Sequence, residues 1–142
     1  TLVELTDFNP ELDENGLLTR PGYAVKPYWR YDRHKIKAGW HRIKEWDYYA
    51  VLSANNGYGI TFTIADLGYI GLAAVCWLDF NSPGAVQYDT MALLPMGRTG
   101  LSSSSGDGTV VFERKRIQLS FQVAGSERKL RFASSDLVCL AY

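Results

Sequence analysis

The sequence has few of the residues that build metal centres or disulfide frameworks. It contains 2 Cys and 2 His, whereas a zinc site or disulfide scaffold needs several such side chains close together. His34 and His41 both lie in a basic segment that would repel a cation. We therefore expect no metal site and no cofactor. Cys76 lies within an apolar run and is expected to be a buried free thiol.

Long apolar runs are also missing. The longest candidate, residues 70–78, is much shorter than the roughly 18 apolar residues of a membrane helix. Residues 1–7 lack the basic-then-apolar pattern of a signal peptide. We expect no transmembrane segment and a cytoplasmic location. Because the sequence does not begin with Met, we also expect a trimmed chain or part of a longer one.

Charge is balanced overall but unevenly distributed. Five of the 15 acids fall in the first 14 residues, seven of the 15 bases fall in residues 26–44, and residues 45–97 contain no Lys or Arg. Bases alternate with aromatics over residues 30–46, a pattern that can bind nucleic acid. The zero net charge and a pI near 6.6 argue against that function. We expect no nucleic-acid partner, and an arm that docks through its aromatic residues.

The remainder of the chain is patterned for strands. Tyr58, Ile60, Phe62 and Ile64 alternate with small or polar residues, as expected for a strand with one buried face. Residues 69–80 are apolar at consecutive positions, which predicts a central strand covered on both faces. Strands are predicted at 46–53, 58–65, 69–80, 85–94, 109–112, 117–123, 129–133 and 137–142.

These predictions define an all-β fold. Residues 1–44 form an irregular N-terminal arm packed on the body, and residues 45–142 form an antiparallel β domain. The regular spacing of the strands is typical of a meander that forms a barrel, half-barrel or sandwich. One helical turn is predicted within residues 31–37.

Two carboxylates are candidates for catalysis. Asp79 ends the apolar run and Asp47 lies between two aromatic residues. Either could be an acid whose pKa is raised by an apolar pocket. The alternative is a strand-end carboxylate that is hydrogen-bonded in a turn or paired with Arg30, Arg33 or Arg42.

Several motifs resemble a known family. They are Arg20-Pro21, the segments 31–33, 42–49, 63–69 and 78–80, and the glycines of the 97–107 loop. Together they resemble an uncharacterised bacterial family, domain of unknown function 2804, from about Asp13 onward. That family is distantly similar to lipocalin-like proteins, including hydroxyneurosporene-type carotenoid hydratases and tocopherol cyclases. The resemblance implies a β-barrel-like fold with an apolar cavity and assigns no catalytic residue.

The resemblance also bears on assembly. Members of the family are usually much longer, so it implies that these residues correspond to an N-terminal half. Sheet edges left open in such a half would be covered by the missing C-terminal half or by a second copy of the chain.

We expect lipocalin-like binding of a small apolar or amphipathic molecule. The expected wall consists of Trp46, Tyr48, Tyr69 and Trp77. Arg42 or Lys44 would contact an anionic head group. One alternative is a hydratase or cyclase that uses Asp47 or Asp79 as a neutral acid. The other is an interaction module that uses the basic residues 26–44.

Overall fold

The computed structural model describes residues 3–82, 84–104, 106–114, 117–135 and 138–141. Two four-stranded antiparallel sheets follow the chain order. The first sheet contains β5 (Glu45–Ser53), β6 (Tyr58–Asp66), β7 (Ile70–Asp79) and β8 (Gly84–Leu93), with η3 (Ala54–Asn56) between β5 and β6. The second contains β9 (Asp107–Arg114), β10 (Ile117–Ala124), β11 (Glu127–Ala133) and β12 (Val138–Ala141).

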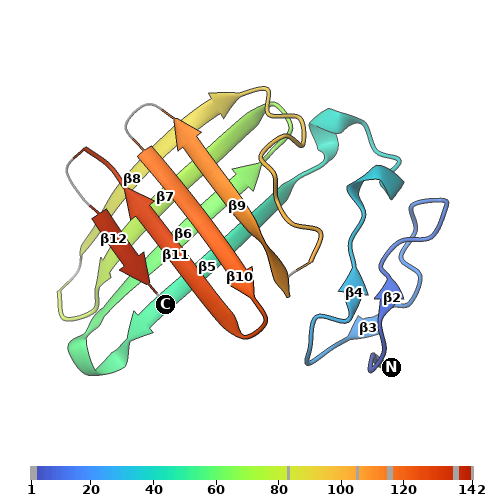
Figure 1. Ribbon diagram of the computed structural model, residues 1–142, viewed down its shortest axis with the longest axis horizontal. Helices are drawn as coiled ribbons and strands as arrows, with labels where there is room; N and C mark the ends of the chain where they lie inside the picture. The colour runs from blue at the N-terminus through green and yellow to red at the C-terminus, as the bar shows by residue number, and fades with distance from the viewer. Residues whose placement is uncertain (1–2, 83, 105, 115–116, 136–137, 142) are drawn as a thin grey trace.

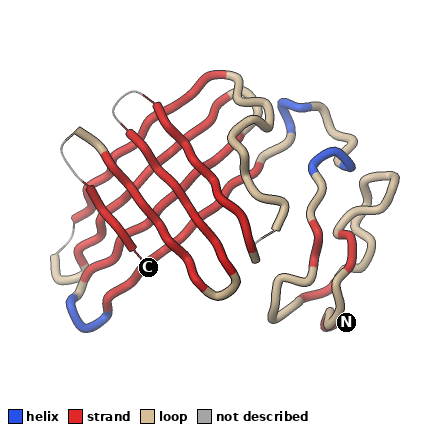
Figure 2. Tube along the Cα trace, viewed as in Figure 1, coloured by secondary structure: helices blue, strands red, loops and turns tan. Residues whose placement is uncertain are grey.

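The two sheets lie face to face, and their strands cross at a steep angle (Figures 1 and 2). Every ladder among the described strands runs within one sheet or within the arm. The prediction of an antiparallel, mostly β protein is therefore confirmed. The boundary between irregular and regular structure falls at Glu45, where β5 begins.

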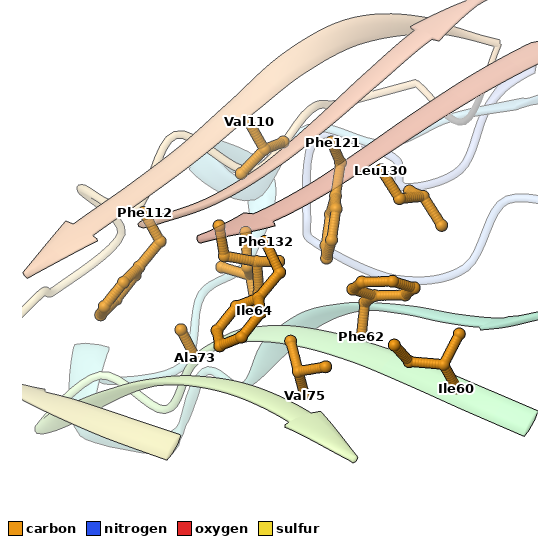
Figure 3. Close-up of a cluster of buried hydrophobic side chains, with 11 residues drawn as sticks. Ile60, Phe62, Ile64, Ala73, Val75, Val110, Phe112, Phe121, Leu130 and Phe132 are labelled. Carbon is orange, nitrogen blue, oxygen red and sulfur yellow. The ribbon is translucent and has the colours of Figure 1, made fainter. Parts of the chain in front are cut away.

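The core fills the space between the sheets. The alternating pattern of β6 buries Ile60, Phe62 and Ile64 on its inner face, with Phe62 and Ile64 fully inaccessible. Phe121 and Phe132 come from the second sheet and point toward them (Figure 3). Burying one such side chain stabilises the fold by about 1.5–3 kcal/mol. These side chains form the hydrophobic core of the protein.

Strand β5 illustrates how register sorts side chains. Asp47 pairs with Ile64 and Tyr49 pairs with Phe62, so both lie on the inner face. Successive strand residues point to opposite faces. Trp46 and Tyr48 therefore lie on the outer face, where they are 63% and 56% exposed.

Strand β7 corrects one expectation. Its apolar residues were expected to be covered on both faces, but only the inner residues, such as Ala73 and Val75, are buried. Leu72, Ala74 and Cys76 alternate with them on the outer face and are only half-buried. The Cys76 thiol is therefore free but not fully buried. A consecutively apolar strand fits either a covered or a partly open face, and its pattern cannot distinguish them.

The N-terminal arm lies beside the two sheets, next to the loop that precedes β9 (Figure 1). It holds two short parallel pairs: β1 (Val3–Glu4) with β3 (Gly22–Tyr23), and β2 (Asn9–Pro10) with β4 (Trp29–Arg30). The predicted helical turn is η1 (Arg33–Lys35), and η2 (Trp40–Arg42) follows it.

Charge within the arm is partly neutralised by its own residues. Lys35 pairs with Glu14 at 2.7 Å and Arg20 pairs with Asp7 at 3.0 Å. The acidic start of the chain thus meets the bases that follow it. None of the described helices has the length and apolar character needed to cross a membrane.

Replacing Phe62 should test the packed core. Phe62→Ala should lower the free energy of unfolding by about 3–5 kcal/mol, because it removes a fully buried ring. Tyr48→Ala, on the exposed face of β5, should cost no more than about 1 kcal/mol. Urea denaturation followed by circular dichroism measures both values. Equal losses for the two variants would contradict the assignment of inner and outer faces.

Candidate functional site

Two neighbouring carboxylates organise one end of the first sheet. Glu45 at the start of β5 pairs in register with Asp66 at the end of β6. Both lie on the inner face by the alternation of their strands. Glu45 holds the arm, and Asp66 holds the loop that follows β8.

Glu45 holds the arm. Its carboxylate accepts a hydrogen bond from the Tyr31 hydroxyl and forms an ion pair with Arg33. The side chains of Glu45 and Arg33 are only 13% and 19% exposed. A pair this shielded is screened less than a surface pair, and removing one partner leaves a buried charge. The start of β5 is therefore tied to the segment around η1.

Asp66 holds the loop after β8. Its side chain is fully buried and accepts hydrogen bonds from the backbone N–H of Gly68 (2.8 Å) and of Gly97 (2.6 Å). The Thr99 hydroxyl donates to the same carboxylate at 3.3 Å. These bonds supply partners for both oxygens of the buried side chain. The carboxylate thus fixes both the β6–β7 turn and the start of the 97–106 loop.

The two anchors meet at Gly97. This residue has φ +84°, a conformation that favours glycine. A Cβ there would lie 2.6 Å from Nε of Arg33. Only glycine lets the Arg33 side chain lie directly against the loop. Arm, sheet and loop therefore form one junction.

A cleft of about 850 Å³ lies at this junction. We call it the arm cleft; residues that line it include Trp29, Tyr31, Arg33, Glu45, Gly97 and Thr99. Phe8 and Leu12 add apolar surface from the arm, and Leu101 adds it from the loop. The volume lies within the usual range for small-molecule sites.

A second hollow of about 260 Å³ continues toward the sheets. We call it the inner pocket; its walls include Trp29, Tyr31, Asp47, Tyr49, Asp107 and Phe121. Trp29, Tyr31 and Asp107 line both hollows, so the two are neighbours. The rings of Tyr49 and Phe121 meet edge to face with centroids 4.8 Å apart.

Trp29 carries a polar atom without a protein partner. Its indole Nε1 is buried, and no hydrogen-bond acceptor for it lies among the described residues. Leaving a buried donor unsatisfied costs about 1–3 kcal/mol. Other parts of the Trp29 side chain line both hollows.

Asp47 has the environment predicted for a raised-pKa acid. It lies half-buried in the wall of the inner pocket, and burial raises the pKa of its carboxyl. Burial also raises the pKa of Tyr49, reinforced by the charge of Asp47, while Arg128 acts in the opposite direction. The pKa of Tyr31 is raised as well, chiefly by burial.

Asp79 does not fit that role. It accepts hydrogen bonds from Ser82 Oγ at 2.7 Å and from the Asn81 backbone N–H at 2.8 Å. These bonds lower the pKa of its carboxyl, with the Ser82 bond as the largest cause. The residue belongs to the β7–β8 turn. The alternative of a hydrogen-bonded turn residue therefore describes Asp79.

The residues expected to line a ligand wall are dispersed. Trp46 and Tyr48 lie on the outer face of β5, while Trp77 is 42% exposed and stacks on Tyr58 at 4.6 Å. Tyr69 is 48% exposed in the turn before β7. The structure does not bring these four side chains together in the arm cleft or the inner pocket.

The two expected head-group residues also lie outside those hollows. Lys44 sits 4.1 Å from the centre of the Tyr69 ring and donates to the carbonyls of His41 and Leu67. With Trp46 it borders a shallower hollow of about 360 Å³ beside the arm cleft. Arg42 is exposed in η2.

The main wall residues were missed because their proximity depends on long-range contacts. Trp29 and Tyr31 follow two prolines in a segment without periodicity. The alternation of Glu45, Asp47 and Tyr49 along β5 was an available signal for one shared face. Among the described residues, no group of three His, Cys, Asp or Glu side chains could hold a metal ion.

These features define the protein as an antiparallel β protein with a cleft between its arm and its sheets. The chain belongs to the family called domain of unknown function (DUF2804), whose family model matches residues 3–139. No curated protein and no solved structure matches the chain.

Glu45→Gln should loosen the arm without unfolding the sheets. Losing the charge that pairs with Arg33 should speed amide exchange over residues 28–35 by about tenfold, equivalent to about 1.4 kcal/mol. Amides of β6 should keep the parent rate. Asp89→Asn, which changes an exposed carboxylate on β8, serves as the matched control. Unchanged exchange in the arm would refute its anchoring by Glu45.

Asp47 and Asp79 should affect stability with opposite signs. A raised folded-state pKa contributes stability below the unfolded value and loses it as pH rises. Asp47→Asn should therefore be more stable than the parent at pH 7, by less than about 1 kcal/mol, and this gain should vanish near pH 3. Asp79 has a lowered pKa, so its ionised side chain stabilises the fold at neutral pH, and this contribution is lost as pH falls. Asp79→Asn should therefore be less stable than the parent at pH 7. Urea denaturation from pH 3 to 7 compares the variants; the same sign for both would contradict these environments.

Proposed function

We propose that the protein binds a small amphipathic molecule in the arm cleft and the inner pocket. The observation that carries the proposal is the pair of adjoining hollows of about 850 and 260 Å³, both lined by Trp29 and Tyr31 of the arm. Apolar parts of the ligand would contact Phe8, Leu12 and Leu101.

The junction supports this proposal by organising the site in advance. Arg33 is held by Glu45, and the loop is held by Asp66. A site that is already ordered loses less conformational entropy when it binds a ligand. In this proposal the two sheets form the wall of a lipocalin-like site. The ligand lies where the sheets meet the N-terminal arm, outside the packed core between them.

The first test is native mass spectrometry of the protein purified gently from cells. We expect a discrete additional mass that organic extraction removes, and its identity names the ligand class. The second is a fluorescence titration with the neutral probe N-phenyl-1-naphthylamine. A chain that carries no adduct and does not bind the probe would overturn the proposal.

Matched tryptophan variants locate the site. Trp29→Leu should weaken probe binding by about tenfold, as expected for losing one well-placed contact, because Trp29 lines both hollows. Trp46→Leu should leave binding unchanged, since that ring lies on the outer face. If only Trp46→Leu weakens binding, the ligand occupies the outer wall inferred from the sequence and the arm cleft is excluded.

An acid-catalysed reaction is the second candidate, favoured by the position of Asp47. A protonated Asp47 carboxyl would donate its proton to an alkene; water or a ligand hydroxyl would then bond to the resulting cation and return a proton to the carboxylate, as in a hydratase or cyclase. In support of this candidate, Asp47 lines the inner pocket and burial raises the pKa of its carboxyl. A carbon-13 NMR titration should place the pKa of Asp47 above that of Asp79. A normal, low pKa at Asp47 would remove this candidate.

A further inference from the structure

The inner pocket has an unusual combination of side chains. Its lining contains four aromatic residues and three carboxylates, and no Lys, Arg or His among the described residues: Trp29, Tyr31, Tyr49 and Phe121 with Glu11, Asp47 and Asp107. The bases of the site, including Arg30, Arg33 and Lys35, line the arm cleft instead. Acids line both hollows, since Asp32, Glu45 and Asp107 also border the arm cleft, so the hollows differ in where the bases lie.

Aromatic faces and carboxylates favour the same kind of ligand group. The negative face of an aromatic ring attracts a cation, and the attraction increases when the cation is desolvated. Asp47 offers a half-buried carboxylate on the inner face of β5. A methylated ammonium group is attracted to both and needs no acceptor aligned with an N–H.

We propose that the inner pocket binds the methylated ammonium group of an organic cation, with Asp47 as its counter-ion and the four rings as its walls. This inference rests on the proposed function and specifies the ligand's head group. The volume of about 260 Å³ suits a head group, whereas the adjoining 850 Å³ cleft has room for the rest of the molecule. Trp29 and Tyr31 come from the arm, so the walls are complete only when the arm is docked.

The geometry on the sheet side is fixed by packing. The Phe121 ring is buried and meets the Tyr49 ring edge to face at 4.8 Å. Tyr49 is two residues from Asp47 on one face of β5. Ring and carboxylate are thus held by neighbouring positions of a single strand.

The test compares two probes of nearly equal shape. Choline carries a trimethylammonium group, and 3,3-dimethylbutan-1-ol replaces its nitrogen with carbon. Titration calorimetry at pH 7 on the full chain should show choline binding at least about tenfold more tightly than the neutral alcohol. N-phenyl-1-naphthylamine is titrated in parallel as the charge-independent probe of the arm cleft.

Variants assign the effect to the pocket. Asp47→Asn keeps the shape of the side chain and should weaken choline binding by about tenfold, while binding of the neutral alcohol stays the same. Tyr49→Leu should also weaken choline binding, and Tyr48→Leu, on the outer face of the same strand, should not. Circular dichroism spectra check that each variant keeps the parent fold.

Acidity provides a further readout. Protonating Asp47 removes the counter-ion, so choline affinity should fall as pH drops below neutrality toward 4 while affinity for the alcohol stays level. The titratable residues that share the pocket with Asp47 are Glu11, Tyr31, Tyr49 and Asp107. Arg128 acts on Tyr49 from β11. The pH-dependent part should disappear in Asp47→Asn.

The outcomes separate the two proposals. Equal binding of choline and the alcohol, or choline binding that Asp47→Asn does not change, overturns the ammonium site and leaves the proposed function standing if the naphthylamine still binds. Failure of all three probes overturns both. Tighter choline binding that depends on Asp47 and Tyr49 supports both.

Discussion

The site depends on one pair of carboxylates side by side in a β ladder. Glu45 and Asp66 are register partners at one end of the first sheet. Because the strands fix their spacing, the arm held by Glu45 and the loop held by Asp66 must lie next to each other. The cleft between them is a consequence of these two anchors. Buried carboxylates require such partners, because desolvation of a charge is costly.

The same sheet supplies two contrasting carboxylates. Asp47 lies between apolar and aromatic walls, so burial disfavours its charged form. Asp79 lies in a turn where a hydroxyl and a backbone N–H donate to it. In the sequence the two positions look alike, because each is an Asp next to apolar or aromatic residues. Their chemistry differs because one strand position points inward and the other ends in a turn.

Much of the fold could be predicted from local patterns. The period-two pattern of β6 and the turn at Asn55–Gly57 suffice to place that strand and its connection. The site was harder to predict, because it depends on which face of a strand each side chain points to and on contacts between distant segments. In β5 aromatic residues occupy both faces, so hydrophobicity does not reveal which side points inward. Trp46 and Tyr48 were chosen for aromatic character, whereas Tyr49 reaches the pocket.

The arm shows the limit of sequence reasoning most clearly. Trp29 lies in a two-residue parallel strand that no periodicity marks. The arm is tied to the sheets by contacts such as the Arg33–Glu45 ion pair, and no sequence pattern identifies the two partners. The sequence concentrates bases in residues 26–44, but it does not indicate which acids they meet or that a cleft results.

The indole N–H signals of the chain's four tryptophans offer the most direct test of the central claim, that ligands bind where the arm meets the sheets. A nitrogen-15 NMR titration with N-phenyl-1-naphthylamine reports on all four at once. The account predicts a large shift of the Trp29 signal, with those of Trp46 and Trp77 unchanged. A shift of Trp46 or Trp77 with Trp29 unmoved would contradict it.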